Sequence, residues 1–165
     1  MRKFLPLIIV GVVVLFGYFY FKGINNTAVT LDQDVKESWG NVQTSYQRRN
    51  DLIGNLVKTV KGAADFEKST LEAVITARSK ATSVTIDPTN ITPEQLAQFN
   101  QAQSGVSSAL SRLLVTVEQY PDLKANQNFL KLQDELASTE NQILTARTRF
   151  NEAVKLYNRH VTIFP

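Results

Sequence analysis

The chain has 165 residues, with 18 lysines and arginines, 15 aspartates and glutamates, and no cysteine. Its net charge of +3 and its isoelectric point near 9.2 come from Arg2, Lys3 and Lys22, which flank an apolar segment. From residue 23 onward bases and acids balance, so this part lacks the broad basic surface that phosphate binding needs. We therefore expect no nucleic-acid partner, and the absence of cysteine excludes a lipid anchor on cysteine.

The first predicted element is a transmembrane helix at residues 4–21, which contain no charged residue. Such a helix spans about 27 Å, close to the thickness of the hydrocarbon core of a bilayer. A cleaved signal peptide also has a basic start, but it needs a shorter apolar core and small residues at the cleavage site. Residues 18–21 are instead bulky and aromatic, as is typical of a membrane interface. We expect an uncleaved anchor at residues 1–22, with the lipid bilayer as the partner of residues 4–21.

The basic residues predict the orientation of this anchor. Arg2 and Lys3 precede the apolar segment, whereas only Lys22 follows it closely. The positive-inside rule places the more basic flank in the cytoplasm. We expect a single-pass protein with a cytoplasmic N-terminus and a periplasmic or extracellular domain.

A short linker is predicted at residues 23–30, followed by a domain at residues 31–165. Residues 30–33 form a capping-box pattern that predicts a helix starting near Leu31, and Gly62 predicts its end. The apolar face of this helix is expected to be Leu31, Val35, Trp39, Val42, Tyr46, Arg49, Ile53, Leu56 and Val60, with Arg49 as its polar member.

Three further helices follow. The second is predicted from about Asp65 to Ala81, with Leu71, Val74, Ile75 and Ala77 on its apolar face. The third starts where Thr92 can cap the helix and Pro93 takes the first helical position, and it continues to Tyr120. The fourth is predicted from Asn126 to Thr162, with a heptad face of Phe129, Leu132, Leu136, Thr139, Ile143, Ala146, Phe150, Ala153, Tyr157 and His160.

The predicted fold class is all-α: an antiparallel up-down-up-down four-helix bundle preceded by one N-terminal transmembrane helix. Short turns join the first helix to the second and the third to the fourth, and short connections favour antiparallel neighbours. The longer connection at residues 82–91 joins the two pairs. No segment shows the alternation of a β-strand, so we expect no sheet.

Several blocks of the sequence resemble the LemA family. They are residues 46–62 (YQRRNDLIGNLVKTVKG), 74–83 (VITARSKATS), 120–143 (YPDLKANQNFLKLQDELASTENQI) and 146–158 (ARTRFNEAVKLYN), together with the anchor and the final Phe164-Pro165. The resemblance implies a bacterial membrane protein with an antiparallel helical bundle. It implies little about activity, because the family has no agreed biochemical function.

The sequence departs from the family pattern at three points. Gly54 stands where the family commonly has proline, and Phe66 precedes Glu67 where a histidine is frequent. The second departure removes any His-Glu pair that could be carried over. The chain also stops where relatives usually continue, which fits either a truncated chain or a short tail.

The sequence shows no recognisable catalytic or metal-binding motif. His160 is the single histidine and there is no cysteine, so neither a di-iron pattern nor HExxH occurs. His160 is expected at a helix end, facing water or headgroups. The sequence contains no serine-nucleophile motif and no phosphate-binding glycine loop. We expect no cofactor and no enzymatic activity.

One polar feature interrupts the apolar faces at mid-height of the bundle. Arg49 lies on the first helix opposite the neighbourhood of Glu140 and Asn141, and Arg78 of the second helix falls near the same level. We predict a polar layer of Arg49 and Glu140, with Arg78 and Asn141 as further candidates. Such a layer either fixes the register of the helices, because an unpaired buried charge is costly, or forms a ligand or partner site.

Three functions stay open at this point. The first is a membrane-anchored helical scaffold or adaptor that contacts an envelope or membrane protein, or pairs with a second copy of itself. The second is a ligand-sensing module that uses the polar layer. The third is a non-catalytic accessory subunit of a membrane enzyme. A pocket beside Arg49 would favour the second of these.

Overall fold

The structure, a computed structural model, describes residues 5–63 and 66–163, with side chains described from Ile9 onward. Five helices occupy these ranges: α1 (Leu5–Lys61), α2 (Lys68–Ser83), α3 (Pro93–Val117), α4 (Pro121–Lys124) and α5 (Gln127–Ile163). No strand occurs in the described ranges. The predicted all-α class is confirmed.

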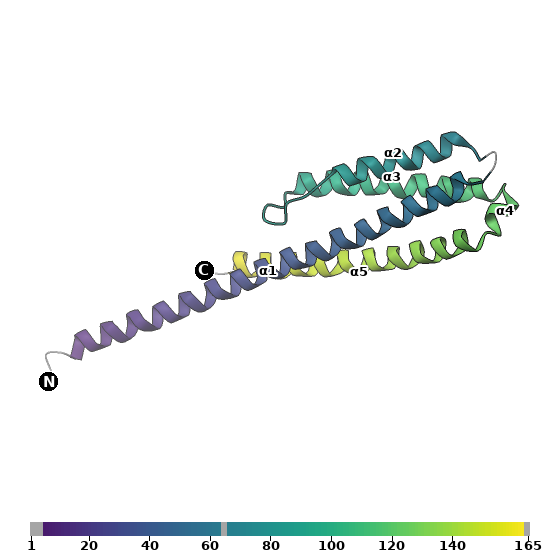
Figure 1. Cartoon of the computed structure of the whole chain (residues 1–165). Coiled ribbons are helices and arrows are strands. Elements are labelled where there is room, and N and C mark those ends of the chain that lie inside the picture. Colours follow the sequence, from purple (N-terminus) through teal and green to yellow (C-terminus); the bar gives the residue numbers. More distant parts are fainter. Residues whose placement is uncertain (1–4, 64–65, 164–165) are drawn as a thin grey trace.

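The helices form an antiparallel bundle of two pairs. Helix α1 runs beside α5 over most of the bundle, and α2 runs beside α3 (Figure 1). The chain reverses direction between successive long helices, so the order is up-down-up-down. The N-terminal part of α1 extends well beyond the other helices, as Figure 1 shows.

Helix α1 is continuous through residues 23–30, which were predicted to be a linker. The predicted helix start at Leu31 is therefore wrong. The hydroxyl groups of Thr27 and Thr30 donate to the carbonyls of Gly23 and Asn26, each at 3.0 Å. Polar side chains that suit a helix cap are thus satisfied inside the helix, and no proline interrupts it. The division into functional units at residues 1–22, 23–30 and 31–165 stays a prediction, and Arg2, Lys3 and residue 4 lie outside the described residues.

The predicted caps of the later helices are present. The side chain of Thr92 accepts the N–H of Gln95 at 3.2 Å, and the Gln95 side chain accepts the N–H of Thr92 at 3.1 Å. The Asn126 side chain accepts the N–H of Phe129 at 3.1 Å at the start of α5. These bonds satisfy N–H groups that a helix start leaves without partners.

Other boundaries differ from the prediction. Helix α2 begins at Lys68, and Asp65, its predicted start, lies outside the described residues, as do Phe164 and Pro165. Ile75 was placed on the apolar face of α2 but is 49% exposed. The short helix α4, which begins at Pro121, was not predicted. A proline at the first helical position is favourable, so it starts this turn rather than only interrupting the chain.

The loop between α2 and α3 is fastened to α1. Ile86 is buried, and its carbonyl accepts Nε2 of Gln43 at 3.1 Å. The next residue, Asp87, accepts both the hydroxyl and the backbone N–H of Thr89 at 2.6 and 2.8 Å. These two bonds, with the hydroxyl first, lower the pKa of the Asp87 carboxyl below its usual value.

The core consists of two apolar clusters stacked along the bundle. The cluster nearer the apolar end of α1 contains Trp39, Val42, Tyr46, Ile86, Phe99, Ile143, Ala146 and Phe150. The second contains residues 52–60 of α1, residues 106–117 of α3 and residues 129–136 of α5, together with residues of α2 and α4. The buried positions of α1 and α5 follow the predicted apolar faces. The gap between the clusters, at residues 47–51 of α1, positions the site described below.

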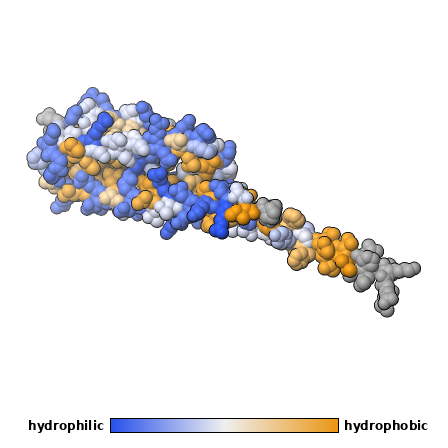
Figure 2. Space-filling model, turned by 180° about the vertical axis from the view of Figure 1, so that it is seen from behind, coloured by the Kyte–Doolittle hydropathy of each residue, from blue (hydrophilic) through white to orange (hydrophobic). Residues whose placement is uncertain are grey.

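The part of α1 that projects from the bundle is apolar and exposed. Figure 2 shows this segment as a narrow rod carrying hydrophobic surface away from the mixed surface of the bundle. Its exposed apolar residues are Ile9, Val10, Val12, Val13, Val14, Leu15, Phe16, Tyr18, Phe19, Tyr20 and Phe21. Among the described residues, α1 is the one helix long and apolar enough to cross a membrane, which fits membrane anchoring.

Candidate functional site

The buried polar residues of the bundle gather between its two apolar clusters. They are Arg49 and Asn50 of α1, Gln103 of α3 and Thr139 of α5. In each of these three helices they lie at the level where the apolar residues change from one cluster to the other. A polar layer therefore crosses the bundle centre.

Arg49 is the central residue of this layer. Its side chain is 2% exposed, and its Nη1 donates to Oε1 of Glu140 at 3.0 Å and to the hydroxyl of Ser107 at 3.3 Å. Its Nη2 donates to the side chain and to the backbone carbonyl of Gln103. The guanidinium also lies over the ring of Tyr46, with Cζ 4.9 Å from the ring centre. One buried cation thus joins α1 to both α3 and α5.

The two residues of this ion pair differ in their exposure to solvent. Glu140 is 47% exposed, so it reaches the pair from the surface of α5. Within the described part of the chain, Nε of Arg49 has no hydrogen-bond partner. A buried N–H without an acceptor is unfavourable unless something else supplies one.

The other predicted residues lie apart from this pair. Nε of Arg78 donates to the backbone carbonyl of Asn50 at 2.7 Å, so Arg78 approaches α1 from α2. A Cβ atom added to Gly54 would lie 3.2 Å from its Nη2, which shows that the guanidinium packs against this glycine. Asn141 is exposed, and its backbone carbonyl accepts the hydroxyl of Thr145 within α5.

A polar cleft opens beside Arg49, between α3 and α5. Its volume is about 500 Å³. The lining residues are Tyr46, Arg49, Asn100, Gln103, Ser104, Ser107, Ser108, Glu140, Ile143, Leu144 and Arg147. Amide and hydroxyl groups predominate, and two cations face one carboxylate. This composition suits a polar ligand with an acidic group.

A smaller cavity adjoins the polar cleft and reaches into the apolar cluster that contains Trp39. It has a volume of about 70 Å³, and it shares Tyr46, Asn100 and Arg147 with the polar cleft. Trp39 lines it, and the indole Nε1 of Trp39 has no hydrogen-bond partner among the described residues. Among the described residues, the two buried side-chain N–H groups without a partner therefore belong to α1 residues that line one or other of these adjoining cavities.

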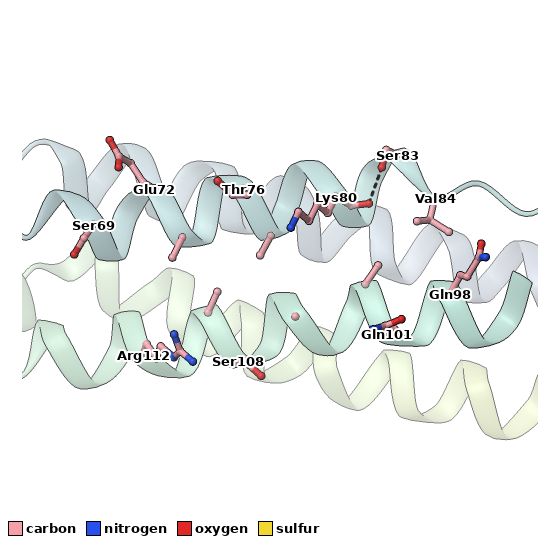
Figure 3. A pocket seen from close by; sticks show the side chains of 15 residues that line it. Ser69, Glu72, Thr76, Lys80, Ser83, Val84, Gln98, Gln101, Ser108 and Arg112 are labelled. Atoms are coloured by element: carbon pink, nitrogen blue, oxygen red, sulfur yellow. Dashed lines mark hydrogen bonds between the residues drawn. The ribbon is translucent and has the colours of Figure 1, made fainter. Parts of the chain in front are cut away.

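A second concave surface lies between α2 and α3, with a volume of about 900 Å³ (Figure 3). Its lining includes the small residues Ala73, Ala77, Ala102, Gly105 and Ala109. The larger side chains of Glu72, Lys80 and Arg112 stand along the two helices, as Figure 3 shows. We call this surface the α2–α3 groove.

His160 was predicted to face water or headgroups, but it also contacts α1. The residue is half-buried, and its Nε2 lies 3.3 Å from the carbonyl oxygen of Ile24. The last turn of α5 therefore packs against the part of α1 that was predicted to be a linker. No cluster of three potential metal ligands occurs in the region that the structure describes.

Comparison with known proteins identifies the family. The family model described as LemA family matches residues 38–165. The chain belongs to the LemA family. The resemblance deduced from the sequence blocks is confirmed, and the match covers the bundle and the α1 residues that enter it.

The LemA-family chain is similar to several curated proteins. Magnetosome protein MamQ 2 of Paramagnetospirillum magneticum is 29% identical over 157 residues, which cover 85% of this chain and 58% of the relative. Protein LemA of Metamycoplasma hominis is 25% identical over 147 residues, which cover 89% of this chain and 64% of the relative. The chain therefore spans less than two thirds of the length of these relatives. Neither the family name nor the names of these relatives are names of enzymes.

Sequence reasoning missed Gln103 as a member of the polar layer of this LemA-family chain. A signal was available, because Phe99, Gln103, Val106 and Leu110 recur at steps of four, three and four. A polar residue at such a position is buried with the apolar ones. The cleft itself depends on the spacing between α3 and α5, which no local pattern reports.

Proposed function

We propose that this chain is a non-enzymatic, membrane-anchored helical adaptor at the bacterial cell envelope, which acts by protein–protein contact. The observation that carries the proposal is the continuity of α1. One helix leads from the exposed apolar residues 9–21 into the buried face that begins at Trp39. At ~1.5 Å per residue its 57 residues span about 85 Å. Such a helix would hold the bundle at a fixed distance and orientation beside a bilayer.

The proposed location is the bacterial cytoplasmic membrane, crossed once. The apolar segment is exposed and uncharged, which favours burial in lipid over exposure to water. The basic residues at the start of the chain favour a cytoplasmic N-terminus and a periplasmic or extracellular bundle. A reporter protein fused after Pro165 tests this orientation, because an enzyme that works only outside the cytoplasm would be active there and inactive in the reverse arrangement.

The α2–α3 groove is the surface that we propose contacts the partner, and a helix of another envelope protein is the proposed occupant. Small side chains at Ala77, Ala102 and Gly105 allow the backbone of a docked helix to approach closely. Lys80 and Arg112 provide charges for orientation at the sides of the groove. A shared membrane raises the effective concentration of both partners, so even a modest contact would suffice.

Site-specific photo-crosslinking in native membranes tests the adaptor function. A photoreactive residue at Thr76 lies in the groove, whereas the same residue at Ser79 is exposed on α2 outside it. We expect a discrete crosslinked product from Thr76 and none from Ser79. A crosslinked product with twice the mass of the chain would show that the partner is a second copy of the chain and not another envelope protein.

Two glycine variants provide the matched control. A Cβ atom at Gly105 or at Gly40 would meet nothing within 4 Å. We therefore expect a larger side chain to be compatible with the fold at both positions. Gly105→Leu fills the groove and should abolish the crosslink, whereas Gly40→Leu on α1 should leave it intact. Equal crosslinking from Thr76 and Ser79, or no product from either, would contradict the proposal.

A further inference from the structure

The polar cleft between α3 and α5 carries an inference that goes beyond the adaptor function and does not depend on it. We propose that this cleft binds the carboxylate group of a small organic acid, and that the bound acid replaces Glu140 as the partner of Arg49. A guanidinium is planar, always charged, and pairs with carboxylates through two parallel hydrogen bonds. Arg49 is therefore the residue that recognises the acid.

The present partners of Arg49 leave it incompletely satisfied. Among the described residues, Glu140 supplies the only negative charge that contacts Arg49, through one oxygen at 3.0 Å. The remaining acceptors, on Gln103 and Ser107, are neutral. The Nε group has no acceptor within the ranges that the structure describes. A carboxylate with two free oxygens can accept from the amino group that Glu140 now holds and from a second donor of the same guanidinium.

Glu140 is suited to exchange. Its side chain is half-exposed, so it can leave Arg49 and rotate into the solvent, where it is hydrated. Arg49 is 2% exposed and cannot leave the core in this way. When the acid binds, the buried cation keeps a counter-charge and the freed Glu140 is hydrated. The exchange is favourable if the acid makes contacts in the cleft that Glu140 does not make.

The cleft offers such contacts. Its volume of about 500 Å³ lies within the ~300–1,000 Å³ range of small-molecule sites and is too small for a protein helix. Asn100, Ser104 and Ser108 line it with amide and hydroxyl groups, which suit hydroxyl or amide substituents on the acid. Arg147 supplies a second cation two helical turns from Glu140, which suits a second acidic group.

The side-chain Nε–H resonance of Arg49 gives a direct readout of binding. We would record it in the full chain in lipid nanodiscs and assign it with Arg49→Lys. Malate is the probe, because it carries two carboxylates and a hydroxyl, and inorganic phosphate and glycerol are the comparisons. We expect a saturable shift of this resonance with malate at millimolar concentration. Phosphate and glycerol should have much weaker effects.

Glu140→Gln separates binding from a purely structural role of the layer. Removing the competing carboxylate should tighten malate binding about tenfold, whereas Glu152→Gln, on an exposed position of the same helix outside the cleft, should leave it unchanged. Ser104→Phe, which places a ring in the cleft and retains both residues of the ion pair, should abolish the shift. The proposal is overturned if neither the wild type nor Glu140→Gln responds to malate, or if phosphate and malate act equally. Because the crosslinking test uses the α2–α3 groove, either proposal can fail while the other holds.

Discussion

Removing the charge of Glu140 tests the energetics of the polar layer most sharply. In Glu140→Gln the shape of the side chain and one acceptor oxygen remain, but the buried guanidinium of Arg49 loses the negative charge that pairs with it. Breaking a fully buried pair costs about 3–5 kcal/mol, and an exposed pair contributes about 0–1 kcal/mol. Because Glu140 is 47% exposed and the amide still accepts a hydrogen bond, we expect a loss of about 1–2 kcal/mol.

Arg49→Met should behave differently. It removes the buried charge, fills most of the same volume, and leaves Glu140 free to be hydrated. Gln103 loses its partner, but it lines the cleft and can bind water. We expect a loss below about 1 kcal/mol, because replacing a buried ion pair with an apolar residue is often neutral.

The double-mutant cycle joins the two variants. In the Arg49→Met background, Glu140→Gln should have almost no effect, which gives a coupling energy of about 1 kcal/mol or more. The free energies of unfolding can be measured by chemical unfolding of the full chain in nanodiscs. The fluorescence of the single tryptophan, Trp39, which is buried in the bundle, reports the transition. Glu140→Gln costing less than about 0.5 kcal/mol, or costing the same in both backgrounds, would refute the reasoning.

Three further predictions concern single sites. Gly54→Ala should be nearly neutral, because the gain of about 1 kcal/mol in helix propensity is offset by displacing the Arg78 guanidinium at 3.2 Å; with Arg78→Met, the same substitution should stabilise by about 1 kcal/mol in urea unfolding. Phe99→Ala should lower the free energy of unfolding by about 3–5 kcal/mol in the same assay, because the centre of this buried ring lies 5.0 Å from that of Tyr46 and 5.3 Å from that of Trp39. A loss below about 1 kcal/mol would contradict this packing. NMR titration should give Asp87 a lowered pKa that rises in Thr89→Ala, and the stabilisation from its hydrogen bonds should be lost as pH falls through that lowered pKa. If the pKa of Asp87 is unchanged in Thr89→Ala, the hydrogen bond from the Thr89 hydroxyl is not the cause of the lowered pKa.

The apolar faces of the helices were predictable, because burial follows a period that the sequence displays. Trp39, Phe129 and Phe150 are buried at the positions that heptad spacing indicates. The same spacing pointed to Arg49, since a polar residue on an otherwise apolar face must be buried with its neighbours. The caps at Thr92 and Asn126 were also legible from local chemistry.

Local chemistry failed where two outcomes share one pattern. Residues 30–33 fit a capping box, but Thr30 donates to Asn26 inside a continuous helix, because nothing in residues 23–30 forces the chain to leave the helical conformation. The direction of Arg78 toward Gly54 could not be predicted, since it depends on how closely α2 approaches α1. The cleft likewise could not be predicted, since it depends on the separation between α3 and α5 at the level of Arg49.

A distance measurement across residues 23–30 tests the central claim, that one rigid helix connects the apolar segment to the bundle. The chain has no cysteine, so spin labels can be attached to cysteines placed at Lys22 and Thr44, which are both exposed. In nanodiscs, electron paramagnetic resonance should give a single narrow distribution centred at about 33 Å, which is 22 residues at ~1.5 Å each. A broad distribution extending to much shorter distances would show a flexible connection, and it would contradict the adaptor geometry proposed for this protein.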